Sequence, residues 1–521
     1  MRVHGPKSLT RRQVLAGGGL TVVGAGGLTL AGLGGYAWPH PTADSTAAPA
    51  TPDDTRGVLH FVTRSDLNPP ALTIAHRDRQ SSAPATDPPY FILAPAGYPL
   101  TGPGEPGLMI LNRKGDIVWY SPNTAFPAST GSGRMDLKVQ SYRGQPVLTW
   151  WQGRVITGYG VGQAVIADSS YQTIATVSAG HGLQADLHEF VITPQDTALI
   201  TAFRPMPADL SALGGPKQGM VLSGTVQEID IASGGVLFQW DSLDHIPVTD
   251  TYQAFAGGTK AAPFDYFHIN SIAIAPDGEL LVSSRNTCAV YKVARPSGQV
   301  TWRLGGKRSS FQMGTGATFW WQHHVRPHGA SGLSIFDDGA SPPKEVQSRA
   351  ILLDLDTTTM KATLQASYTH PAGLLAANQG SMQVLADGRV LVGWGNLPYF
   401  SEFAPDATLI LDGQFPIGDQ SYRAFTADWT GHPTDKPAVV AEVNPAGGST
   451  VYASWNGATE LDSWTVLAGA SGGRLSKVGS QQHSGFETTI TVNTTGPWFG
   501  VTANDAAGNV LGQSATVRIT G

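Results

Sequence analysis

The chain has 521 residues, of which 41% are hydrophobic and only 14% charged, and its formal net charge is −6. A chain with an excess of acidic residues is poorly suited to phosphate backbones, so the composition argues against a nucleic-acid partner. The 63 glycines and 36 prolines favour many short strands and turns over long helices, and a single cysteine excludes an internal disulfide framework.

Residues 1–38 predict a twin-arginine export signal. Arg11 and Arg12 stand ahead of an uncharged, glycine-rich apolar run that extends to about Trp38. That run is also long enough to span a bilayer, so a membrane tether through an uncleaved signal stays open beside cleavage. Residues 39–56, rich in proline, alanine, threonine and aspartate, predict a disordered linker. We therefore expect an exported protein that is secreted, held in the cell envelope or membrane-anchored.

Residues 57–435 carry two loose repeats of strands and turns. An apolar strand, a turn and a second apolar strand recur around Gln195-Asp196, Asp277-Gly278, Asp338-Gly339 and Asp387-Gly388. A glycine-led strand that ends in tryptophan recurs at Trp119, Trp240 and Trp302. Short antiparallel units repeated along a chain are typical of a β-propeller, and this range would hold six blades. A pair of β-sandwiches is the alternative.

Residues 436–521 have a different sequence pattern from residues 57–435. They show short alternating strands such as "STVYASWNG" and "WFGVTAND", with Trp455 and Trp464 near the start. This pattern predicts a C-terminal immunoglobulin- or fibronectin-like sandwich, and it suggests support or adhesion rather than chemistry. The expected fold is therefore all-β, with a six-bladed propeller followed by a sandwich.

Histidines stand just before three successive strand–turn–strand units: His188, His268 and His323, the last followed by His324. In a propeller, equivalent positions on different blades converge near the central channel. Three imidazoles could bind a metal ion, but no Asp or Glu recurs beside them in register. His268 is accompanied instead by Asn270, two residues along the same strand face, and by Arg285. The sequence therefore predicts no metal site.

A guanidinium, an amide and imidazoles together suit a tetrahedral oxyanion, because they supply several N–H donors. A neutral histidine in such a pocket can also act as a nucleophile. We expect transfer of a sulfuryl or phosphoryl group through histidine, with no cofactor. Lys307 could attract an anionic donor or be a solvated turn residue, and Asp186 or Glu189 could orient His188. Some aromatic residues could stack an aryl ring or only pack the blades: Trp320, Trp321, Trp394, Tyr399 and Phe400.

Five stretches resemble the arylsulfotransferase family, the bacterial aryl-sulfate sulfotransferases that do not use the adenylyl-sulfate donor. They are "ADLHEFVITPQDTALIT", "FDYFHINSIAIAPDGELLVSSRNTCAVYKV", "GQVTWRLGGKRSSF", "WQHH" and "GWGNLPYFSEF". The likeness covers about residues 60–430 and is strongest to the actinobacterial and fungal branch. It implies a six-bladed propeller that moves a sulfuryl group from a phenolic sulfate ester to a phenolic acceptor, by a ping-pong route through a sulfohistidine.

The same resemblance implies a role for each site residue. His323 resembles the histidine that is transiently sulfated, with the adjacent His324 as the open alternative. His268 and Asn270 resemble the paired pocket residues, Arg285 the arginine that holds the sulfuryl oxygens, and His188 the remaining pocket histidine.

Cys288 is expected to be a buried small hydrophobe, and it lacks the following Pro-x-Arg that sulfatases need to make formylglycine. A non-catalytic ligand-binding or adhesive propeller is the first rival to the transferase. A quinone-dependent propeller dehydrogenase is the second, but the acidic calcium set it needs is not found in register.

Overall fold

The computed structural model describes residues 57–76, 89–96, 102–124, 131–156 and 158–520. The predicted export signal and linker, residues 1–56, lie outside this part of the chain. Within it, strands dominate, and helical structure is confined to three short 3-10 turns: η2 (Ser211–Leu213), η3 (Ser242–Asp244) and η4 (Val248–Asp250). The predicted all-β class is confirmed.

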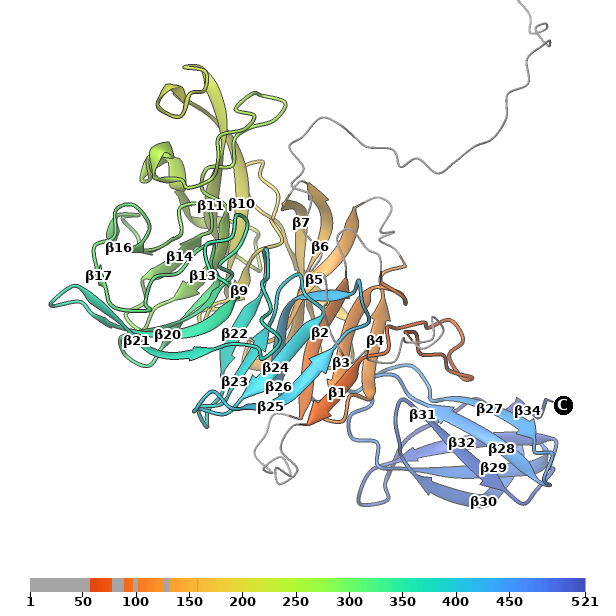
Figure 1. The fold of residues 1–521 in the computed structure, drawn as a ribbon. Helices are drawn as coiled ribbons and strands as arrows, with labels where there is room; N and C mark the ends of the chain where they lie inside the picture. The colour runs from red at the N-terminus through yellow and green to blue at the C-terminus, as the bar shows by residue number, and fades with distance from the viewer. Residues whose placement is uncertain (1–56, 77–88, 97–101, 125–130, 157, 521) are drawn as a thin grey trace, which may run out of the picture. The chain divides into compact units, whose positions relative to one another are not determined.

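Strands β1–β26 form six sheets of four or five strands (Figure 1). The first holds β26 (Gln420–Ala427), β2 (Tyr90–Ala96), β3 (Gly107–Asn112) and β4 (Ile117–Pro122). The second holds β5 (Ser132–Tyr142), β6 (Gln145–Ile156), β7 (Tyr159–Ala167) and β8 (Thr173–Val177). The third holds β9 (Phe190–Ile192), β10 (Thr197–Ala208), β11 (Gly219–Asp230) and β12 (Val236–Asp241).

The other three sheets follow the same order along the chain. The fourth holds β13 (Ile269–Ile274), β14 (Leu280–Ser284), β15 (Ala289–Val293) and β16 (Val300–Gly305). The fifth holds β18 (His323–His328), β19 (Gly332–Asp337), β20 (Arg349–Asp356), β21 (Lys361–Tyr368) and the short parallel partner β17 (Gln312–Met313). The sixth holds β22 (Ser381–Val384), β23 (Val390–Gly393), β24 (Tyr399–Phe403), β25 (Leu409–Gln414) and β1 (Thr73–His76).

The first-named strand of each sheet is called its inner strand below: β26, β5, β9, β13, β18 and β22. Going round, β26 contacts β5, β5 contacts β9, β13 contacts β18, β18 contacts β22, and β22 contacts β26. The third and fourth sheets meet through β10 and β13. The first sheet closes this ring, because it pairs Tyr90 near the N-terminus with Ala427 near the C-terminal end of the ring. Side chains on the inner strands therefore share one central space.

The sequence repeats correspond to defined positions in these sheets. The tryptophan-ending strands are the fourth strands β4, β12 and β16. Three of the four predicted turns do join the first two strands of a sheet, and Gly278 there has a φ of 84°, which suits glycine. The fourth instead begins the connection between the second and third strands of its sheet, β19 and β20. The β18–β19 hairpin turns at residues 329–331, and Asp338 follows β19 at the opposite end, where it meets the start of β18.

Strands β27–β34 form two further sheets. One holds β27 (Ala438–Val443), β28 (Ser449–Ser454) and β31 (Glu487–Val492). The other holds β30 (Arg474–Gln482), β29 (Ser463–Ser471), β32 (Trp498–Asn504), β33 (Val510–Gln513) and β34 (Val517–Arg518). Buried side chains from both sheets, Trp464 and Val451 among them, make one core. The predicted boundary between residues 435 and 436 falls in the segment between β26 and β27.

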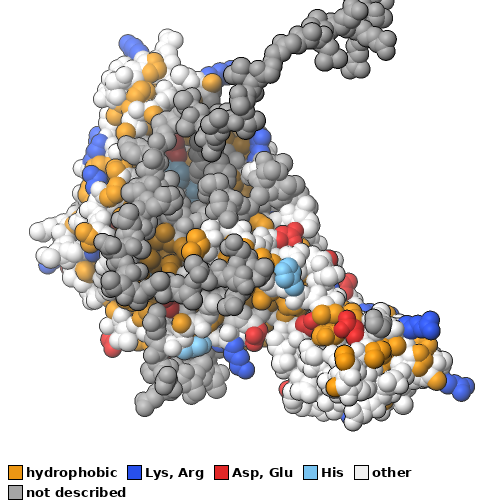
Figure 2. Space-filling view, turned by 45° about the vertical axis from the view of Figure 1, so that its right-hand side comes forward, with side chains coloured by type: hydrophobic (Ala, Val, Ile, Leu, Met, Phe, Trp, Pro, Cys, Tyr) orange, Lys and Arg blue, Asp and Glu red, His pale blue; other side chains and the backbone are white. Residues whose placement is uncertain are grey.

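Charged side chains are scattered over the face of the molecule seen in Figure 2. The exposed large hydrophobic residues likewise come from different loops and strands, such as Val346 and Ile417 in loops and Leu237 in β12. Within the described ranges, no helix combines the length and the apolar composition that crossing a membrane requires.

Candidate active site

The structure brings His188, His268 and His323 together at the starts of three inner strands. His188 lies two residues before β9, His268 immediately precedes β13, and His323 is the first residue of β18. The rings of His188 and His268 stand edge to face, with centroids 4.9 Å apart. His188 and His323 are buried, and 14% of the His268 side chain is exposed. The cluster therefore lies at one end of the central space, shielded from bulk water.

Each of the three rings forms a hydrogen bond between its Nδ1 atom and a carboxylate. The Nδ1 atom lies 2.6 Å from Asp186 Oδ2 in His188, 2.5 Å from Asp265 Oδ2 in His268, and 2.7 Å from Asp338 Oδ2 in His323. No carboxylate recurs in register, yet each ring meets one, and the expectation that His268 is accompanied by Asn270 and Arg285 instead of a carboxylate is wrong. Only Asp186 was detectable from the sequence, because the offsets differ: Asp186 and Asp265 precede their histidines by two and three residues, whereas Asp338 arrives through the β18–β19 pairing.

Asp186 is held by more than the imidazole. It also accepts hydrogen bonds from the backbone N–H groups of Gly160 and His188 and from the hydroxyl of Thr201. These donors, together with His188, hold the pKa of Asp186 below its ordinary value, against the effect of burial. The prediction that Asp186 or Glu189 orients His188 is thus met by Asp186, whereas Glu189 pairs with cations.

The expectation that His268 and Asn270 share a strand face rested on regular alternation, which fails here. His268 has a φ of 51°, and the β13–β14 register shifts between Ile269 and Ser271. Asn270 is fully buried, and its Nδ2 donates to the backbone carbonyl of Gln322 at 2.6 Å. Gln322 in turn donates to Ser283, Ser284 and Ala289. This pair ties the chain before His323 to the sheet that carries His268.

Arg285 follows β14, and its backbone N–H donates to the carbonyl of His268. Its guanidinium lies 5.0 Å from the ring of Trp321 and donates to Asn286 Oδ1, Ser341 O and Ala377 O. These acceptors are neutral, and no carboxylate within the described residues forms an ion pair with it. A buried guanidinium that no carboxylate contacts directly is suited to an anionic ligand.

His323 is held in one tautomer by its surroundings. Its Nδ1 faces Asp338 and also the backbone carbonyl of Trp321 at 3.1 Å, and both are acceptors. Its Nε2 lies 3.3 Å from the backbone N–H of Gln379, a donor. Burial, and then the positive charge of Arg285, hold the pKa of His323 well below its ordinary value. The ring is therefore neutral, with its lone pair on Nε2.

His324 and Lys307 lie away from the cluster. His324 is buried with its Nδ1 3.1 Å from Met382 O and its ring against Phe425. It lines a cavity at the far ends of the inner strands, beside Lys138, Arg326 and His328. The ammonium of Lys307 donates to the carbonyls of Thr249 and Thr251 and lies over the ring of Tyr252. Adjacent His323 and His324 thus face opposite ends of the central space.

The sequence left two roles open for its aromatic residues, and packing between the sheets is the one seen for Trp321, Trp394 and Phe400, which are fully buried. Trp320 meets Tyr252 edge to face. The ring of Phe203 instead lies 5.8 Å from that of His268 and 6.0 Å from that of His188, and Tyr159 stacks against Phe203. Phe203 lies in the long strand β10, whose pattern carries no polar marker that would single it out.

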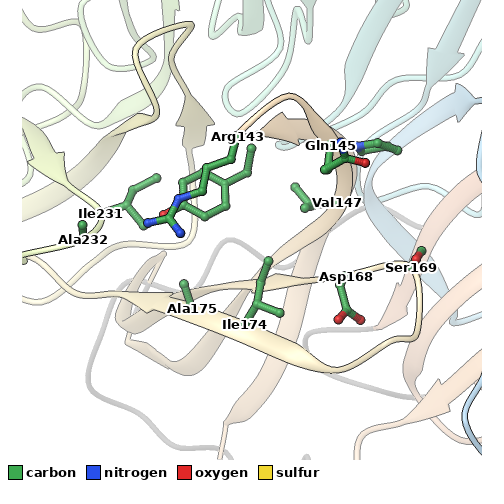
Figure 3. Close-up of a pocket in the computed structure, with 11 residues that line it drawn as sticks. Arg143, Gln145, Val147, Asp168, Ser169, Ile174, Ala175, Ile231 and Ala232 are labelled. Atoms are coloured by element: carbon green, nitrogen blue, oxygen red, sulfur yellow. The ribbon is translucent and has the colours of Figure 1, made fainter.

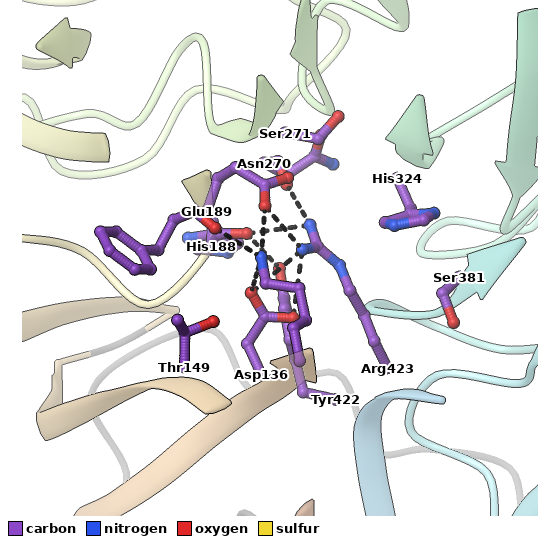
Figure 4. A network of polar contacts seen from close by, with 12 residues as sticks. Asp136, Thr149, His188, Glu189, Asn270, Ser271, His324, Ser381, Tyr422 and Arg423 are labelled. Atoms are coloured by element: carbon purple, nitrogen blue, oxygen red, sulfur yellow. Dashed lines mark hydrogen bonds and ion pairs between the residues drawn. The ribbon is translucent and has the colours of Figure 1, made fainter. Parts of the chain in front are cut away.

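A buried ionic network occupies the middle of the central space, between the two ends (Figure 4). Arg423 on β26 pairs with Asp136 on β5 and with Glu189 before β9, and it also donates to the carbonyls of His188 and Asn270. Lys138 pairs with the same two carboxylates, and Arg326 pairs with Glu189. The network thus connects β26, β5, the start of β9, β13 and β18, and two of its hydrogen bonds are accepted by the backbone of the site residues His188 and Asn270.

Cys288 is buried and has no disulfide partner, and burial raises the pKa of its thiol to about 12. The expectation that Cys288 is buried is confirmed. Among the described residues, no group of three or more His, Cys, Asp and Glu side chains is arranged to hold a metal ion.

A separate cavity lies between the second and third sheets (Figure 3). It is lined by the β5–β6 turn at Arg143 and Gln145 and by Ile174, Ile231 and neighbours. The backbone N–H of Arg143 donates to Asp196, in the turn that ends β9. This cavity therefore lies at the end of these strands opposite to His188, and it contains none of the predicted site residues.

The family model for arylsulfotransferase (ASST) matches residues 138–416, more than half of the chain. The chain belongs to the arylsulfotransferase family. The matched range holds every site residue predicted from the sequence, as well as Asp338 and Gln379. Membership in the arylsulfotransferase family supports a sulfotransferase-type activity, with small aryl donor and acceptor molecules as substrates.

No curated protein matches this arylsulfotransferase family member. Among solved structures it is similar to a protein of unknown function from Bacteroides caccae, at 12% identity and a TM-score of 0.38, over 62% of this chain and 93% of that one. A catalytically inactive virginiamycin B lyase from Staphylococcus aureus matches at 9% identity and a TM-score of 0.34, over 74% of this chain and 97% of that one. A protein from Lactobacillus plantarum matches at 14% identity and a TM-score of 0.32, over 77% of this chain and 99% of that one.

Proposed function

We propose that this protein is an exported aryl-sulfate sulfotransferase that works by a ping-pong route through a sulfated His323. The observation that carries the proposal is the pairing of a neutral, buried His323, whose lone pair lies on Nε2, with the guanidinium of Arg285, whose hydrogen-bond acceptors are all neutral. A nucleophile beside fixed N–H donors is what transfer of an anionic tetrahedral group requires.

In the first half-reaction, His323 Nε2 attacks the sulfur of a phenolic sulfate ester. The N–S bond forms as the S–O bond to the aryl group breaks, and the phenolate leaves with the bonding pair. The backbone N–H of Gln379 donates to His323 Nε2 in the free protein. When the donor binds, this N–H turns to the sulfuryl oxygens and donates to them together with Arg285 as charge shifts onto them. The phenolate takes the Nε2 proton of a neighbouring ring, His188 or His268, that enters this step doubly protonated and leaves it neutral, with its remaining proton on Nδ1 facing its carboxylate.

In the second half-reaction, an acceptor phenol enters the vacated position and returns its proton to the same imidazole. Its oxygen attacks the sulfur, the S–N bond breaks, and the lone pair returns to His323 Nε2. Burial lowers the pKa of His268, so this ring is ready to take the acceptor proton. Phe203 and Tyr159, which flank the histidines, supply apolar contact for the aryl rings.

Within this proposal the six sheets are the blades of a propeller, and its closed ring of inner strands places the site at one end of the axis. Strands β27–β34 form a C-terminal immunoglobulin-like sandwich that makes no contribution to the chemistry. Residues 1–38 serve as the twin-arginine signal for export.

The direct test is a transfer assay with purified protein, 4-nitrophenyl sulfate and a second phenol, without nucleotide or added metal. We expect nitrophenol release that depends on the acceptor, and parallel lines in double-reciprocal plots with both substrates varied. Brief exposure to the donor alone should add one sulfuryl group to the intact protein by mass spectrometry. Release into water that is independent of the acceptor would contradict the proposal.

Replacing Arg285 by glutamine is expected to slow transfer by about 10²–10³-fold, because a fixed donor to the sulfuryl oxygens is lost. The rate of adduct formation falls at low pH as the His323–Asp338 pair takes up a proton, and this fall, the acid limb of the pH profile, should move to higher pH by on the order of one unit. The positive charge of Arg285 lowers the pKa of both His323 and Asp338, so the pair is protonated at higher pH when that charge is removed. The rate of adduct formation against pH, in single turnover, measures both effects.

Arg285→Lys is the matched control, since it keeps the charge but not the planar fork. Its acid limb should stay close to that of the wild type while its rate still falls. The other charged groups that act on His323 are His188, His268 and Arg423, and both variants leave them in place. An acid limb that moves equally in the two variants would contradict the role given to the charge.

A further inference from the structure

Asp338 is the most isolated of the carboxylates at the three histidines. Its side chain is fully buried, and its Oδ1 has no hydrogen-bond partner among the described residues, so its polar contact is with His323. Its backbone is fixed, because its carbonyl accepts a 2.6 Å hydrogen bond from the hydroxyl of Ser348. Burying a carboxylate is costly unless it faces a matching donor, so this position is built around the His323 ring.

Three contacts agree on where the His323 proton lies. The carbonyl of Trp321 can only accept, so it requires N–H at Nδ1, and Oδ2 of Asp338 lies where it can accept from the same N–H. Burial raises the pKa of Asp338 well above its ordinary value, and the charge of Arg285 acts against this. The backbone N–H of Gln379 can only donate, so it requires a lone pair at Nε2. Trp321 and Gln379 themselves have φ values of 60° and 69°. Backbone strain of this kind persists only where the surroundings hold it, and here it brings both backbone groups to the ring.

The same Nδ1 contact recurs at His188 and His268, although their carboxylates come from different chain positions. All three rings therefore turn Nε2 away from a carboxylate. This repetition indicates that the carboxylates orient the rings.

We propose that Asp338 is the positioning residue of the nucleophile, which fixes the Nδ1 proton of His323 and stabilises the ring as Nε2 becomes sulfated. The inference rests on the proposed sulfohistidine. When the N–S bond forms and the aryl S–O bond breaks, the ring gains positive charge while its proton stays on Nδ1 facing Asp338. When the acceptor oxygen takes the sulfuryl group, the N–S bond breaks and the ring returns to neutral. Asp338 itself neither gains nor loses a proton.

The tautomer can be measured in the free protein by ¹⁵N NMR of histidine-labelled full-length chain, with His323→Asn used to assign the signals. We expect a protonated Nδ1 and an unprotonated Nε2 in the wild type. Asp338→Asn removes the charged acceptor and should shift the His323 signals towards the other tautomer. A wild-type ring protonated at Nε2 would overturn the proposal, whether or not any sulfotransferase activity is found.

The kinetic arm uses the same variant. Asp338→Asn is expected to slow formation of the sulfated protein by on the order of 10³-fold, while KM for the donor changes by no more than about threefold. Asp265→Asn is the matched control: it should move the His268 signals and leave those of His323 in place. An Asp338→Asn protein that forms the adduct within threefold of the wild-type rate would also overturn the proposal. If this variant does not fold, the proposal is tested by the wild-type ¹⁵N spectrum, which shows whether Nδ1 or Nε2 of His323 is protonated.

A failure of the proposed sulfuryl transfer can be told apart from a failure of the Asp338 proposal. If only the transfer is wrong, no adduct forms in any protein, including the wild type, while the Nδ1 tautomer of His323 and its dependence on Asp338 are still observed.

Discussion

His323→Asn is expected to abolish sulfuryl transfer, with kcat reduced by about 10⁴-fold or more, because the atom that would carry the sulfuryl group is removed. The asparagine amide nitrogen has no lone pair able to attack sulfur. Neither the acceptor-dependent release of nitrophenol nor the mass increase of one sulfuryl group should remain. Because His323 sits in a preformed site held by Gln322 and Asp338, the donor should still bind.

The matched control is His324→Asn, at the neighbouring buried histidine. His324 faces the opposite end of the central space and contacts Met382 and Phe425. Its loss is therefore expected to change activity through stability alone, with the adduct still formed. An adduct that persists in His323→Asn and disappears in His324→Asn would show that the nucleophile is the other histidine.

Arg423→Leu is expected to lower the free energy of unfolding by about 3–5 kcal/mol, because it removes one of the two cations that the buried carboxylates of Asp136 and Glu189 share and leaves them with Lys138. The side chain of Arg423 is only 1% exposed, so water cannot replace it. The shift of the denaturant midpoint measures this loss. Activity should fall in the protein that remains folded, because Arg423 also donates to the carbonyls of His188 and Asn270.

Arg64→Leu is the control for this prediction. Arg64 pairs with Asp66, but the two side chains are 31% and 63% exposed, so the pair should contribute less than about 1 kcal/mol. Equal losses of unfolding free energy in the two variants would contradict the view that burial makes the Arg423 network important for stability.

Part of the site could be predicted from the sequence because it recurs. A histidine before each of three similar strand–turn–strand units marks equivalent positions, and the structure does bring His188, His268 and His323 to one end of the inner strands. The polar residues near His268 were detectable for the same reason, since Asn270 and Arg285 interrupt an apolar pattern. Local pattern sufficed wherever a residue and its marker lie in one unit.

Other residues could not be predicted, because their role depends on pairing between segments. Asp338 was read as part of a turn, but the β18–β19 register carries it back to His323. The regular alternation assumed for His268 and Asn270 is broken by a bulge and a positive φ. Phe203 and Arg423 come from other sheets and carry no local mark of a site.

The sequence by itself determined the all-β class, the family and the three histidines, since strand periodicity, turn residues and repeated motifs are local properties of the chain. Only the tertiary structure decided which carboxylate holds each ring, which of two adjacent histidines keeps its lone pair beside Arg285, and which cations hold the inner strands together. The physical reason is that burial, hydrogen-bond direction and charge proximity arise only when distant segments meet.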